Sequence, residues 1–443
     1  MCGIFAILSN KSIPITNLFL ILNELKHRGK DSFGISYSKN NNNIETLKLL
    51  KLPEITTFNN SNVNIAITHN RYSTNTNKNN NNFINQIQPI EFKNNTLEFS
   101  LVHNGNISNI HKYINYNNND FSDTQNIMKF FTNITHDDFE SKLIEFINTV
   151  HCSYSIIIMY NHSLYVLRDK YGYKPVMLGQ INNDYCISSE NCITNFNKIR
   201  DIEPGEILKI SSNTYETIYK PINKSNISKC IFEFIYFMSE STTFNNHNVF
   251  NIRKKLGIEL AKNEKYKFNK KNTIVIGSPN TAIPMGRGYA DYLNIHYEQL
   301  LVKQRDCGRT FILKDQTSRQ NACKKFIINK EYIKNKNIIL VDDSLVRGNT
   351  IKSLANMFHE CGCNELHIRI CSPELTHPCY YGIDIPTKEE LIINNYSIPE
   401  IETHCNITSL RYLSLNSMIN AFGNDTEFCT SCFTGNYNKE LDW

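Results

Sequence analysis

The sequence predicts two consecutive domains: an α+β sandwich of stacked antiparallel sheets covered by helices, then an α/β domain built on a parallel sheet. In the first half, short β-type runs alternate with turns, and few helices lie between them. In the second half, apolar strand runs are separated by amphipathic helical stretches, which is the pattern of parallel βαβ units. The pattern changes after about Lys229, so we expect the domains to span residues 2–228 and 229–443.

In the first domain, several runs have the length and composition of β-strands and end in turn residues. One early stretch, residues 15–27, instead has its apolar side chains at helical spacing and stops at Gly29. Strand runs framed by few helices indicate sheets that bury one face against each other and the other face under helices. The strand runs are residues 65–69, 99–103, 155–160, 164–168 and 185–189.

The second domain contains two nearly all-apolar strand runs, residues 273–277 and 338–341. Such runs are typical of strands buried on both faces of a parallel sheet, where ligands bind at the carboxyl ends of the strands. Residues 365–371 alternate polar and apolar side chains, which predicts a strand at the edge of the sheet. Residues 350–361 form an amphipathic helix, with Ile351, Leu354, Met357 and Phe358 on one face.

The composition is that of a globular protein of ordinary charge. The chain has 443 residues, 40% of them hydrophobic, and a net charge of +5 that is spread along the sequence, so no nucleic-acid partner is expected. The longest apolar stretches are far too short to cross a bilayer, and no secretory leader is visible, so we expect a cytoplasmic protein without membrane contact. Under those conditions the 14 cysteines predict thiols, metal ligands or catalysis rather than disulfides.

Cys2 follows the initiator methionine directly. Removal of Met1 would leave a free α-amine beside the Cys2 thiol, and this amine has an ordinary pKa of about 7.7–8.0. It can therefore act as general base for the thiol without a histidine. A buried structural cysteine is the alternative, but three polar segments follow Cys2 in order. They are residues 27–32 (HRGKDS), 69–74 (HNRYST) and 103–106 (HNGN).

Together these segments resemble the glutaminase domain of class II glutamine amidotransferases, which has the N-terminal-nucleophile fold, over roughly residues 1–225. The resemblance implies that Cys2 attacks the glutamine amide and that the Asn104 side chain and the Gly105 N–H stabilise the oxyanion. It also implies that Arg71 pairs with the glutamine carboxylate and that Asp123 binds the α-ammonium. Without the surrounding motif, Arg71 would be interpreted as half of a surface ion pair.

Residues 338–350 combine a buried strand, two carboxylates and a loop rich in hydroxyl and N–H donors that leads into a helix. Helix N-termini bind phosphate, and carboxylates can face ribose hydroxyls or Mg²⁺. Paired aspartates after four apolar residues are costly in a plain surface loop unless a cation or donor meets them. The segment resembles the phosphoribosyl diphosphate motif of type I phosphoribosyltransferases. The ligands implied are Asp342, Asp343, Ser344, Arg347, Gly348, Asn349 and Thr350.

Upstream, residues 302–311 carry the cations Lys303, Arg305 and Arg309 around Gly308, which suits a lid over a diphosphate; a solvated basic loop is the alternative. The order of glutaminase, lid and Asp-Asp motif resembles the glutamine phosphoribosyl diphosphate amidotransferases. The resemblance implies synthesis of 5-phosphoribosylamine, glutamate and pyrophosphate from glutamine, water and 5-phosphoribosyl 1-diphosphate, the first step of de novo purine synthesis. It further implies Mg²⁺, an internal ammonia channel, and a homotetramer inhibited by purine nucleotides.

The second half departs from that family pattern in several places. The lid has Gln304, Asp306 and Cys307 where the family usually has Asn, Tyr and Val. After the first strand of this domain, Asn280 replaces an acid, whereas Thr281 keeps the hydroxyl that could contact Mg²⁺. An alternative function is therefore a regulator that binds phosphoribosyl diphosphate and has lost its transferase activity.

Two cysteines near the carboxyl end, Cys429 and Cys432, form a C-x-x-C pair followed by Phe-Thr-Gly. This ending resembles the branch of the amidotransferases that carries a [4Fe–4S] cluster, and the resemblance implies Cys230 and Cys379 as the other two ligands. Four thiolates are the usual ligand set of such a cluster. Zinc bound by the same four residues and unligated core cysteines are the alternatives.

Overall fold

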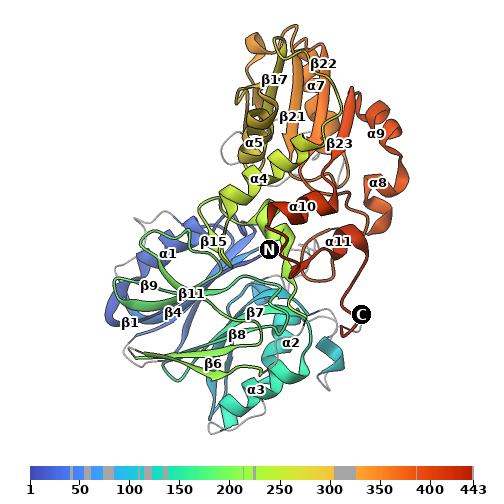
Figure 1. Ribbon diagram of the computed structural model, residues 1–443. Coiled ribbons are helices and arrows are strands. Elements are labelled where there is room, and N and C mark those ends of the chain that lie inside the picture. The colour runs from blue at the N-terminus through green and yellow to red at the C-terminus, as the bar shows by residue number, and fades with distance from the viewer. Residues whose placement is uncertain are drawn as a thin grey trace.

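The computed structural model describes residues 1–39, 43–53, 61–72, 84–107, 110–113, 122–132, 138–212, 214–222, 226–303, 326–385 and 387–441. Figure 1 shows the first half of the chain as the lower lobe and the second half as the upper lobe, with helices α10 (Leu415–Ala421) and α11 (Ser431–Thr434) beside the junction. The two predicted fold classes are confirmed.

The first half contains two antiparallel sheets, of seven and six strands among the described segments. The larger sheet has the order β11-β9-β10-β1-β4-β2-β3 and the smaller sheet the order β13-β12-β8-β7-β6-β5. The larger consists of β1 (Gly3–Pro14), β2 (Ser32–Ser38), β3 (Glu45–Leu49), β4 (Asn62–Arg71), β9 (Met177–Ile181), β10 (Asp184–Ser188) and β11 (Asn197–Asp201). The smaller consists of β5 (Ile90–Lys93), β6 (Glu98–Asn106), β7 (Ser153–Tyr160), β8 (Ser163–Arg168), β12 (Ile207–Ser211) and β13 (Thr214–Tyr219).

The two sheets stack because their strands are apolar on alternate residues. In β1, Ile4 and Ala6 pack between the sheets, whereas Phe5 and Ile7 pack in the core under helix α1 (Ile15–Glu24). Helices α2 (Asp123–Phe130) and α3 (Phe139–Thr149) cover the outer face of the smaller sheet. The result is a four-layer sandwich in which strand ends from both sheets meet at one edge.

The second half is built on a five-stranded parallel sheet with the order β18-β17-β21-β22-β23. Alternate residues of its central strand face opposite cores, Ile339 on one side and Leu340 on the other, so both faces are covered. Helices α4 (Val249–Lys262) and α5 (Ile283–Leu293) cover one face; α7 (Asn349–Glu360) and α9 (Ile398–Cys405) cover the other. The strands are β17 (Thr273–Gly277), β18 (His296–Tyr297), β21 (Asn337–Asp342), β22 (Glu365–Ile370) and β23 (Ser409–Tyr412).

The prediction of an edge strand at residues 365–371 is wrong, because β22 lies between β21 and β23. Its alternating polar side chains are buried rather than exposed. His367 Nδ1 lies 2.8 Å from Ser409 Oγ, and Arg369 Nε donates to Glu264 Oε2 at 2.5 Å. Polar partners distant in the sequence therefore compensate the buried polar groups.

The predicted helix over residues 15–27 is shorter than expected and ends at Glu24. The chain then turns through residues 25–28, and this turn directs Arg28 into the protein, where its side chain is fully buried.

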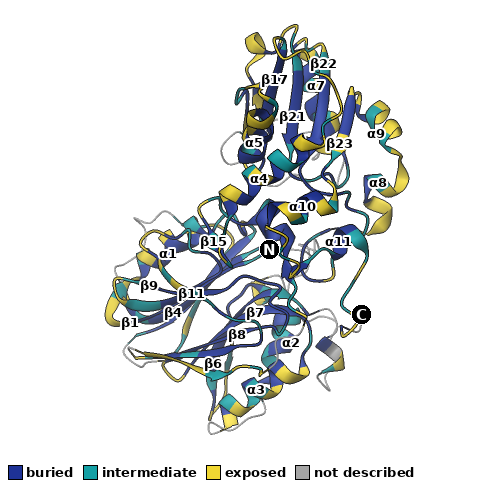
Figure 2. Ribbon diagram, in the orientation of Figure 1, coloured by how far each residue is buried: buried dark blue, intermediate teal, exposed yellow. Residues whose placement is uncertain are grey.

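The two halves share one continuous hydrophobic core. Phe5 of the first half and Phe232, Phe237 and Val275 of the second half belong to the same cluster of buried side chains. Two short strands close the seam: β14 (Lys229–Cys230) pairs in parallel with β24 (Phe428–Cys429), which brings the carboxyl-terminal segment back to the start of the second half. The buried residues at the junction in Figure 2 therefore belong to a core that both lobes share.

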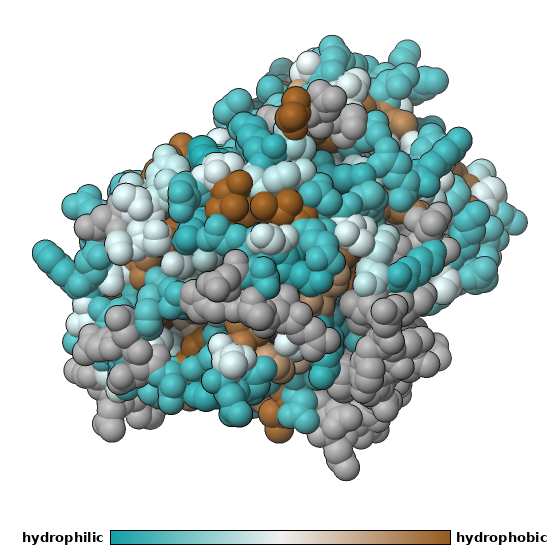
Figure 3. All heavy atoms as spheres, turned by 90° about the horizontal axis from the view of Figure 1, so that it is seen from below, coloured by the Kyte–Doolittle hydropathy of each residue, from teal (hydrophilic) through white to brown (hydrophobic). Residues whose placement is uncertain are grey.

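The underside of the molecule, shown in Figure 3, is mostly hydrophilic, with apolar side chains in small separate groups. Within the segments that the structure describes, no helix has both the length and the apolarity needed to cross a bilayer.

Candidate active site

Cys2 lies at the amino end of β1, beside the end of β6. Its backbone N–H donates a hydrogen bond of 3.1 Å to Asn104 Oδ1, and its Sγ lies 3.9 Å from the Tyr72 carbonyl oxygen. Asn104 is fully buried, and its Nδ2 has no hydrogen-bond partner among the described residues. A buried N–H donor without an acceptor is costly unless a ligand supplies one. Asn104 therefore holds Cys2 with one amide atom and keeps the other available next to it.

Gly105 is at a position that only glycine can occupy. A Cβ there would lie 2.1 Å from the Ser153 carbonyl oxygen and 2.8 Å from Tyr154 Cα, both in the neighbouring strand β7. Backbone atoms of a central strand cannot move away, so the absence of a side chain lets β6 and β7 approach beside Asn104.

Arg71, at the end of β4, and Asp123, at the start of α2, lie close enough for their charges to interact. Burial lowers the pKa of Arg71, and the nearby groups of Cys2, Asp31 and Asp123 oppose this shift. Asp123 Oδ2 accepts the Ile107 N–H at 3.3 Å and lies 3.6 Å from His103 Nδ1. A cation and a carboxylate thus face the region of the nucleophile, as recognition of an α-amino acid requires.

At the other site, Asp342 ends strand β21 and Asp343 follows it, both at the carboxyl edge of the parallel sheet. Burial and the neighbouring Asp343 raise the pKa of Asp342 to about 8, and burial also raises the pKa of Asp343. Asp343 accepts hydrogen bonds from Thr281 and, at 2.7 Å, from Ser344 Oγ. Asp343 is buried and Asp342 is half-buried, and two adjacent carboxyl groups of this kind favour a bound cation, which would allow both to ionise.

The loop after Asp343 leads into helix α7 through Gly348. Its φ of 79° lies in the left-handed region, and a Cβ there would lie 2.5 Å from Ile392 Cδ1. The 12-residue helix that follows presents its N-terminal N–H groups at the same edge of the sheet as the aspartates. Arg347 lies in this loop, and its Nε donates to Glu390 Oε2 at 2.8 Å.

A cavity of about 780 Å³ extends from the paired aspartates to the first half of the chain. Tyr72, whose carbonyl oxygen is next to Cys2 Sγ, lines it together with His27 and Lys30 of the first half. From the second half, the lining includes Thr281, Lys303, Asp342, Asp343, Ser344, Arg347, Gly348, Asn349 and Thr350, all of which the sequence predicts as ligands. Arg305, the other predicted lid cation, lies outside the described residues, as do Gln304, Asp306 and Cys307.

Arg253 is a cavity residue that the sequence reasoning missed. It is buried, and its guanidinium donates to the carbonyl oxygens of Phe234 (2.9 Å) and Met238 (2.8 Å). It also forms an ion pair of 3.8 Å with Glu240, and its charge opposes the rise in the pKa of Asp343. The signal was present: Arg253 interrupts the apolar face of helix α4 between the buried residues Ile252 and Leu256. A charged residue on a buried helical face requires a partner.

The four predicted metal-binding cysteines come together at the seam. Cys230 and Cys429 are directly paired residues of β14 and β24, and Cys432 follows in α11. Burial raises the pKa of Cys432 far above its ordinary value, and the nearby thiols of Cys379, Cys429 and Cys230 raise it further. All four are free thiols. We call Cys230, Cys379, Cys429 and Cys432 the cysteine quartet.

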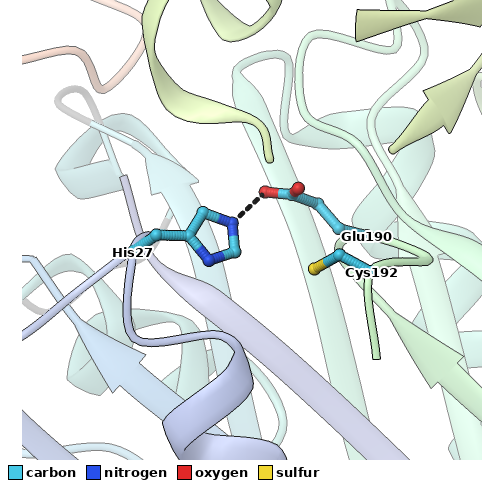
Figure 4. Close-up of side chains that lie close together, drawn as sticks. All are labelled: His27, Glu190 and Cys192. Carbon is cyan, nitrogen blue, oxygen red and sulfur yellow. Dashed lines mark hydrogen bonds and ion pairs between the residues drawn. The ribbon is translucent and has the colours of Figure 1, made fainter. Parts of the chain in front are cut away.

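A second group of metal-ligand side chains, His27, Glu190 and Cys192, lies within 4.8 Å (Figure 4). Glu190 is fully buried and accepts four hydrogen bonds: from Arg28 Nη1 (2.5 Å), His27 Nε2 (3.0 Å), Ser239 N (2.7 Å) and Thr242 Oγ1 (2.7 Å). Binding of a metal ion would require those donors to leave, so we interpret the group as a hydrogen-bonded network rather than a metal site.

That network connects Cys2 with the second half. Arg28 Nε donates to the Cys2 carbonyl oxygen at 2.8 Å, and Arg28 Nη2 donates to Glu233 Oε1 at 3.0 Å. The backbone of the nucleophile is thus held by a guanidinium whose two carboxylate partners, Glu190 and Glu233, come from the two different halves.

Known proteins match the chain in both halves. Residues 71–195 match the family described as glutamine amidotransferase domain, and residues 246–373 match the phosphoribosyl transferase domain. Three curated relatives, all named amidophosphoribosyltransferase, come from Methanocaldococcus jannaschii, Bacillus subtilis and Drosophila melanogaster. The first is 32% identical over 100% of this chain and 98% of its own length. The second is 30% identical over 99% and 94%, and the third is 30% identical over 100% and 90%.

Two solved structures resemble the whole fold. The glutamine phosphoribosylpyrophosphate amidotransferase from B. subtilis, complexed with ADP and GMP, has a TM-score of 0.85 and 29% identity and covers 98% of this chain and 97% of its own. A structure described as the allosteric regulatory enzyme of purine biosynthesis has a TM-score of 0.86 and 29% identity, with 98% and 96% coverage. With two domains in this order and full-length relatives at this identity, the chain belongs to the amidophosphoribosyltransferase family, whose members transfer nitrogen from glutamine to a phosphoribosyl group.

Proposed function

We propose that the chain divides the family reaction between the two ends of the shared cavity. Residues 2–228 release ammonia from glutamine, and residues 229–443 transfer it to 5-phosphoribosyl 1-diphosphate. The observation that carries this proposal is the cavity itself, which extends from Tyr72 beside Cys2 to the paired aspartates Asp342 and Asp343. A closed route matters because ammonia that escaped into water would be protonated and would lose its nucleophilic lone pair.

At the glutaminase end, the Cys2 thiolate attacks the side-chain amide carbon of glutamine, and the carbonyl oxygen gains negative charge. The unpartnered Asn104 Nδ2 and the Gly105 N–H are the donors for that oxyanion, each worth about 2.7–4 kcal/mol. Ammonia leaves, a thioester remains, and water hydrolyses it to glutamate. Arg71 binds the glutamine carboxylate, and Asp123 binds the α-ammonium.

At the transferase end, ammonia attacks the anomeric carbon and pyrophosphate leaves. Mg²⁺, when bound, neutralises the charge of the leaving diphosphate. Asp342, Asp343 and the Thr281 hydroxyl fit this ion because they are hard oxygen donors and the buried carboxylates need a cation. Lys303 and Arg305 bind the diphosphate. The remaining ligands, for the ribose and its 5-phosphate, are Ser344, Arg347, Gly348, Asn349 and Thr350.

For the cysteine quartet we propose a [4Fe–4S] cluster. Across the described residues, no three of its sulfurs lie within 4.8 Å of one another. The sulfurs of a tetrahedral zinc site are about 3.8 Å apart, given Zn–S bonds of about 2.3 Å. The wider spacing, the burial of the thiols and the absence of disulfides among them favour a cluster in which each thiolate binds a different iron.

Protein purified without oxygen is expected to be brown and to contain about four irons and four inorganic sulfides per chain. The Cys429→Ser variant should lose iron and solubility before it loses specific activity, since the quartet lies at the seam and not along the cavity. Elemental analysis that finds zinc without iron, or a colourless active protein, would contradict the cluster and leave the two active sites unaffected.

We further propose that purine nucleotides inhibit the enzyme and that it assembles as a homotetramer in the cytoplasm. The support for inhibition is the related B. subtilis enzyme, which is described in complex with ADP and GMP. No nucleic-acid or membrane partner enters this proposal.

A coupled assay separates this function from that of a regulator without transferase activity. The purified protein should release pyrophosphate from 5-phosphoribosyl 1-diphosphate when glutamine or ammonia is supplied, and not when both are omitted. Binding of 5-phosphoribosyl 1-diphosphate without pyrophosphate release under any of these conditions would favour the regulator.

A further inference from the structure

The strand ends that carry the proposed oxyanion donors are tied to the second half of the chain by side-chain hydrogen bonds. Asn106 Nδ2 donates to the Tyr380 carbonyl oxygen at 2.9 Å, and Ser153 Oγ donates to the Tyr381 carbonyl oxygen at 3.0 Å. Asn106 and Ser153 are directly paired residues of β6 and β7, one position beyond Gly105. Two neighbouring strand ends of the first half are therefore attached to consecutive carbonyl groups of the second half.

Gly382, which follows these two carbonyl groups, approaches Gly105 itself. Gly382 is buried and has a φ of 93°, in the left-handed region that favours glycine. A Cβ there would lie 3.0 Å from the carbonyl carbon of Gly105 and 3.1 Å from its oxygen. A side chain at position 382 would thus press on the backbone of Gly105. We call Tyr380, Tyr381 and Gly382 the contact segment.

The contact segment is held firmly on its other side. The ring of the buried Tyr381 stacks on Tyr173, with centroids 4.3 Å apart, and its hydroxyl oxygen accepts the Asn438 N–H at 2.9 Å. Ile383, which follows Gly382, is buried in the core that the two halves share. A close-packed interior transmits a displacement rather than absorbing it. A displacement at this contact therefore falls on the strand ends of the first half.

The position of Gly105 matters because an oxyanion donor is effective only when its N–H points at the developing charge. A misplacement of about 1 Å can cost about 100-fold in rate. Gly105 has no side chain with which to anchor its backbone, so its neighbours must fix it. Asn106, Ser153 and Gly382 make the contacts across the seam that do this.

We propose that the contact segment is a positioning element for the Gly105 N–H, supplied by the second half to the glutaminase end. The inference rests on the proposed role of Gly105 as an oxyanion donor. The three residues act through the backbone of Gly105 and take no part in the chemistry themselves. The glutaminase site is then complete only when the two halves are docked.

The test compares Gly382→Ala with Gly423→Ala in the full-length protein. Gly423, which follows helix α10, has a φ of 74°, and a Cβ there would meet no atom of the described residues within 4 Å. Both variants place an alanine in left-handed backbone, but Gly382→Ala alone also presses on Gly105. The measurements are kcat and KM with glutamine, the ammonia-dependent rate, and the thermal unfolding midpoint.

Gly382→Ala is expected to lower kcat with glutamine by about 10-fold, because a displacement well below 1 Å should cost less than the full misplacement of a catalytic group. The KM for glutamine should change far less, since the contact is with Gly105 and not with Arg71 or Asp123. The ammonia-dependent rate should stay at the parental value. Gly423→Ala should keep the parental kcat, KM and ammonia-dependent rate.

Ser153→Ala tests the same contact without adding volume, so it decides the question if Gly382→Ala does not fold. It should show a smaller loss of kcat with glutamine and an unchanged ammonia-dependent rate. Ser100→Ala is its control, because Ser100 is buried in β6 and donates to Ser36 Oγ at 2.8 Å within the first half. This control should keep the parental ratio of the two rates.

Parental kcat with glutamine in folded Gly382→Ala, or in Ser153→Ala, would overturn the proposal. Equal loss of the glutamine-dependent and ammonia-dependent rates would also overturn it, since that result indicates general damage to packing. A raised KM at parental kcat would do the same by indicating a role in glutamine binding. Glutamine-dependent synthesis that survives Cys2→Ala would instead contradict the proposed glutaminase chemistry, so the two failures are distinguishable.

Discussion

Replacing Cys2 by alanine is expected to abolish glutamine-dependent synthesis of phosphoribosylamine while leaving synthesis from added ammonia at the parental rate. Loss of a catalytic nucleophile typically lowers turnover by about 10⁴-fold or more. Among the described residues, the Cys2 thiol makes one long hydrogen bond, 3.9 Å to the Tyr72 carbonyl oxygen, so its removal should not disturb the fold. The two rates are measured in one assay, with glutamine or ammonium chloride as nitrogen donor.

Cys186→Ala provides the matched control, because Cys186 is a buried thiol in β10 of the same sheet and takes no part in the chemistry. It should leave the ratio of glutamine-dependent to ammonia-dependent rates unchanged. Equal loss of both activities in Cys2→Ala would contradict the assignment of the two half-reactions to the two ends of the cavity.

The double variant Asp342→Asn, Asp343→Asn is expected to lose phosphoribosylamine formation with either nitrogen donor, while basal glutaminase activity persists. Asparagine keeps the shape of each side chain but cannot neutralise Mg²⁺ or the groups that approach the ribose. Unfolding should not explain the loss. Burial disfavours the charged form of both aspartates, so amides at these positions should leave the thermal stability of the metal-free protein unchanged or higher.

Asp291→Asn is the control for the double variant, because Asp291 lies on helix α5 in an exposed ion pair with Lys254 at 2.8 Å. It should retain the activity of the parent. Synthesis from ammonia at the parental rate in the double variant would place the transferase site elsewhere in the protein.

Local sequence patterns correctly predicted the strands and helices that depend on the spacing of apolar residues within one segment. The run at residues 273–277 corresponds to strand β17, and the amphipathic helix at 350–361 corresponds to α7 shifted by one residue. The strand β22 was assigned to the wrong position in the sheet because alternation reports polarity, not exposure. Arg369 can be buried because it donates a hydrogen bond to Glu264. Glu264 lies 105 residues earlier in the chain, so no local pattern encodes that partner.

The candidate site shows the same division. The Cys2 start and the Asp342-Asp343 loop are contiguous motifs, so their chemistry could be inferred from the sequence. The contacts that join them could not. Glu190 gives no sign in the sequence that it receives hydrogen bonds from Arg28 and Thr242, because those donors come from segments brought together only by the shared core.

Because Cys230 pairs with Cys429, the seam between the two halves can close only after the later residue has been synthesised. The quartet includes residues separated by about 200 positions, and a ribosome adds roughly 5–20 residues per second, so about 10–40 s pass between the synthesis of the first and the last ligand. During that interval the edge of β14 has no partner strand and the Cys230 thiol has no metal. Loading of the proposed cluster must therefore follow the synthesis of Cys432, and a cell short of iron would accumulate chains that remain open at the seam.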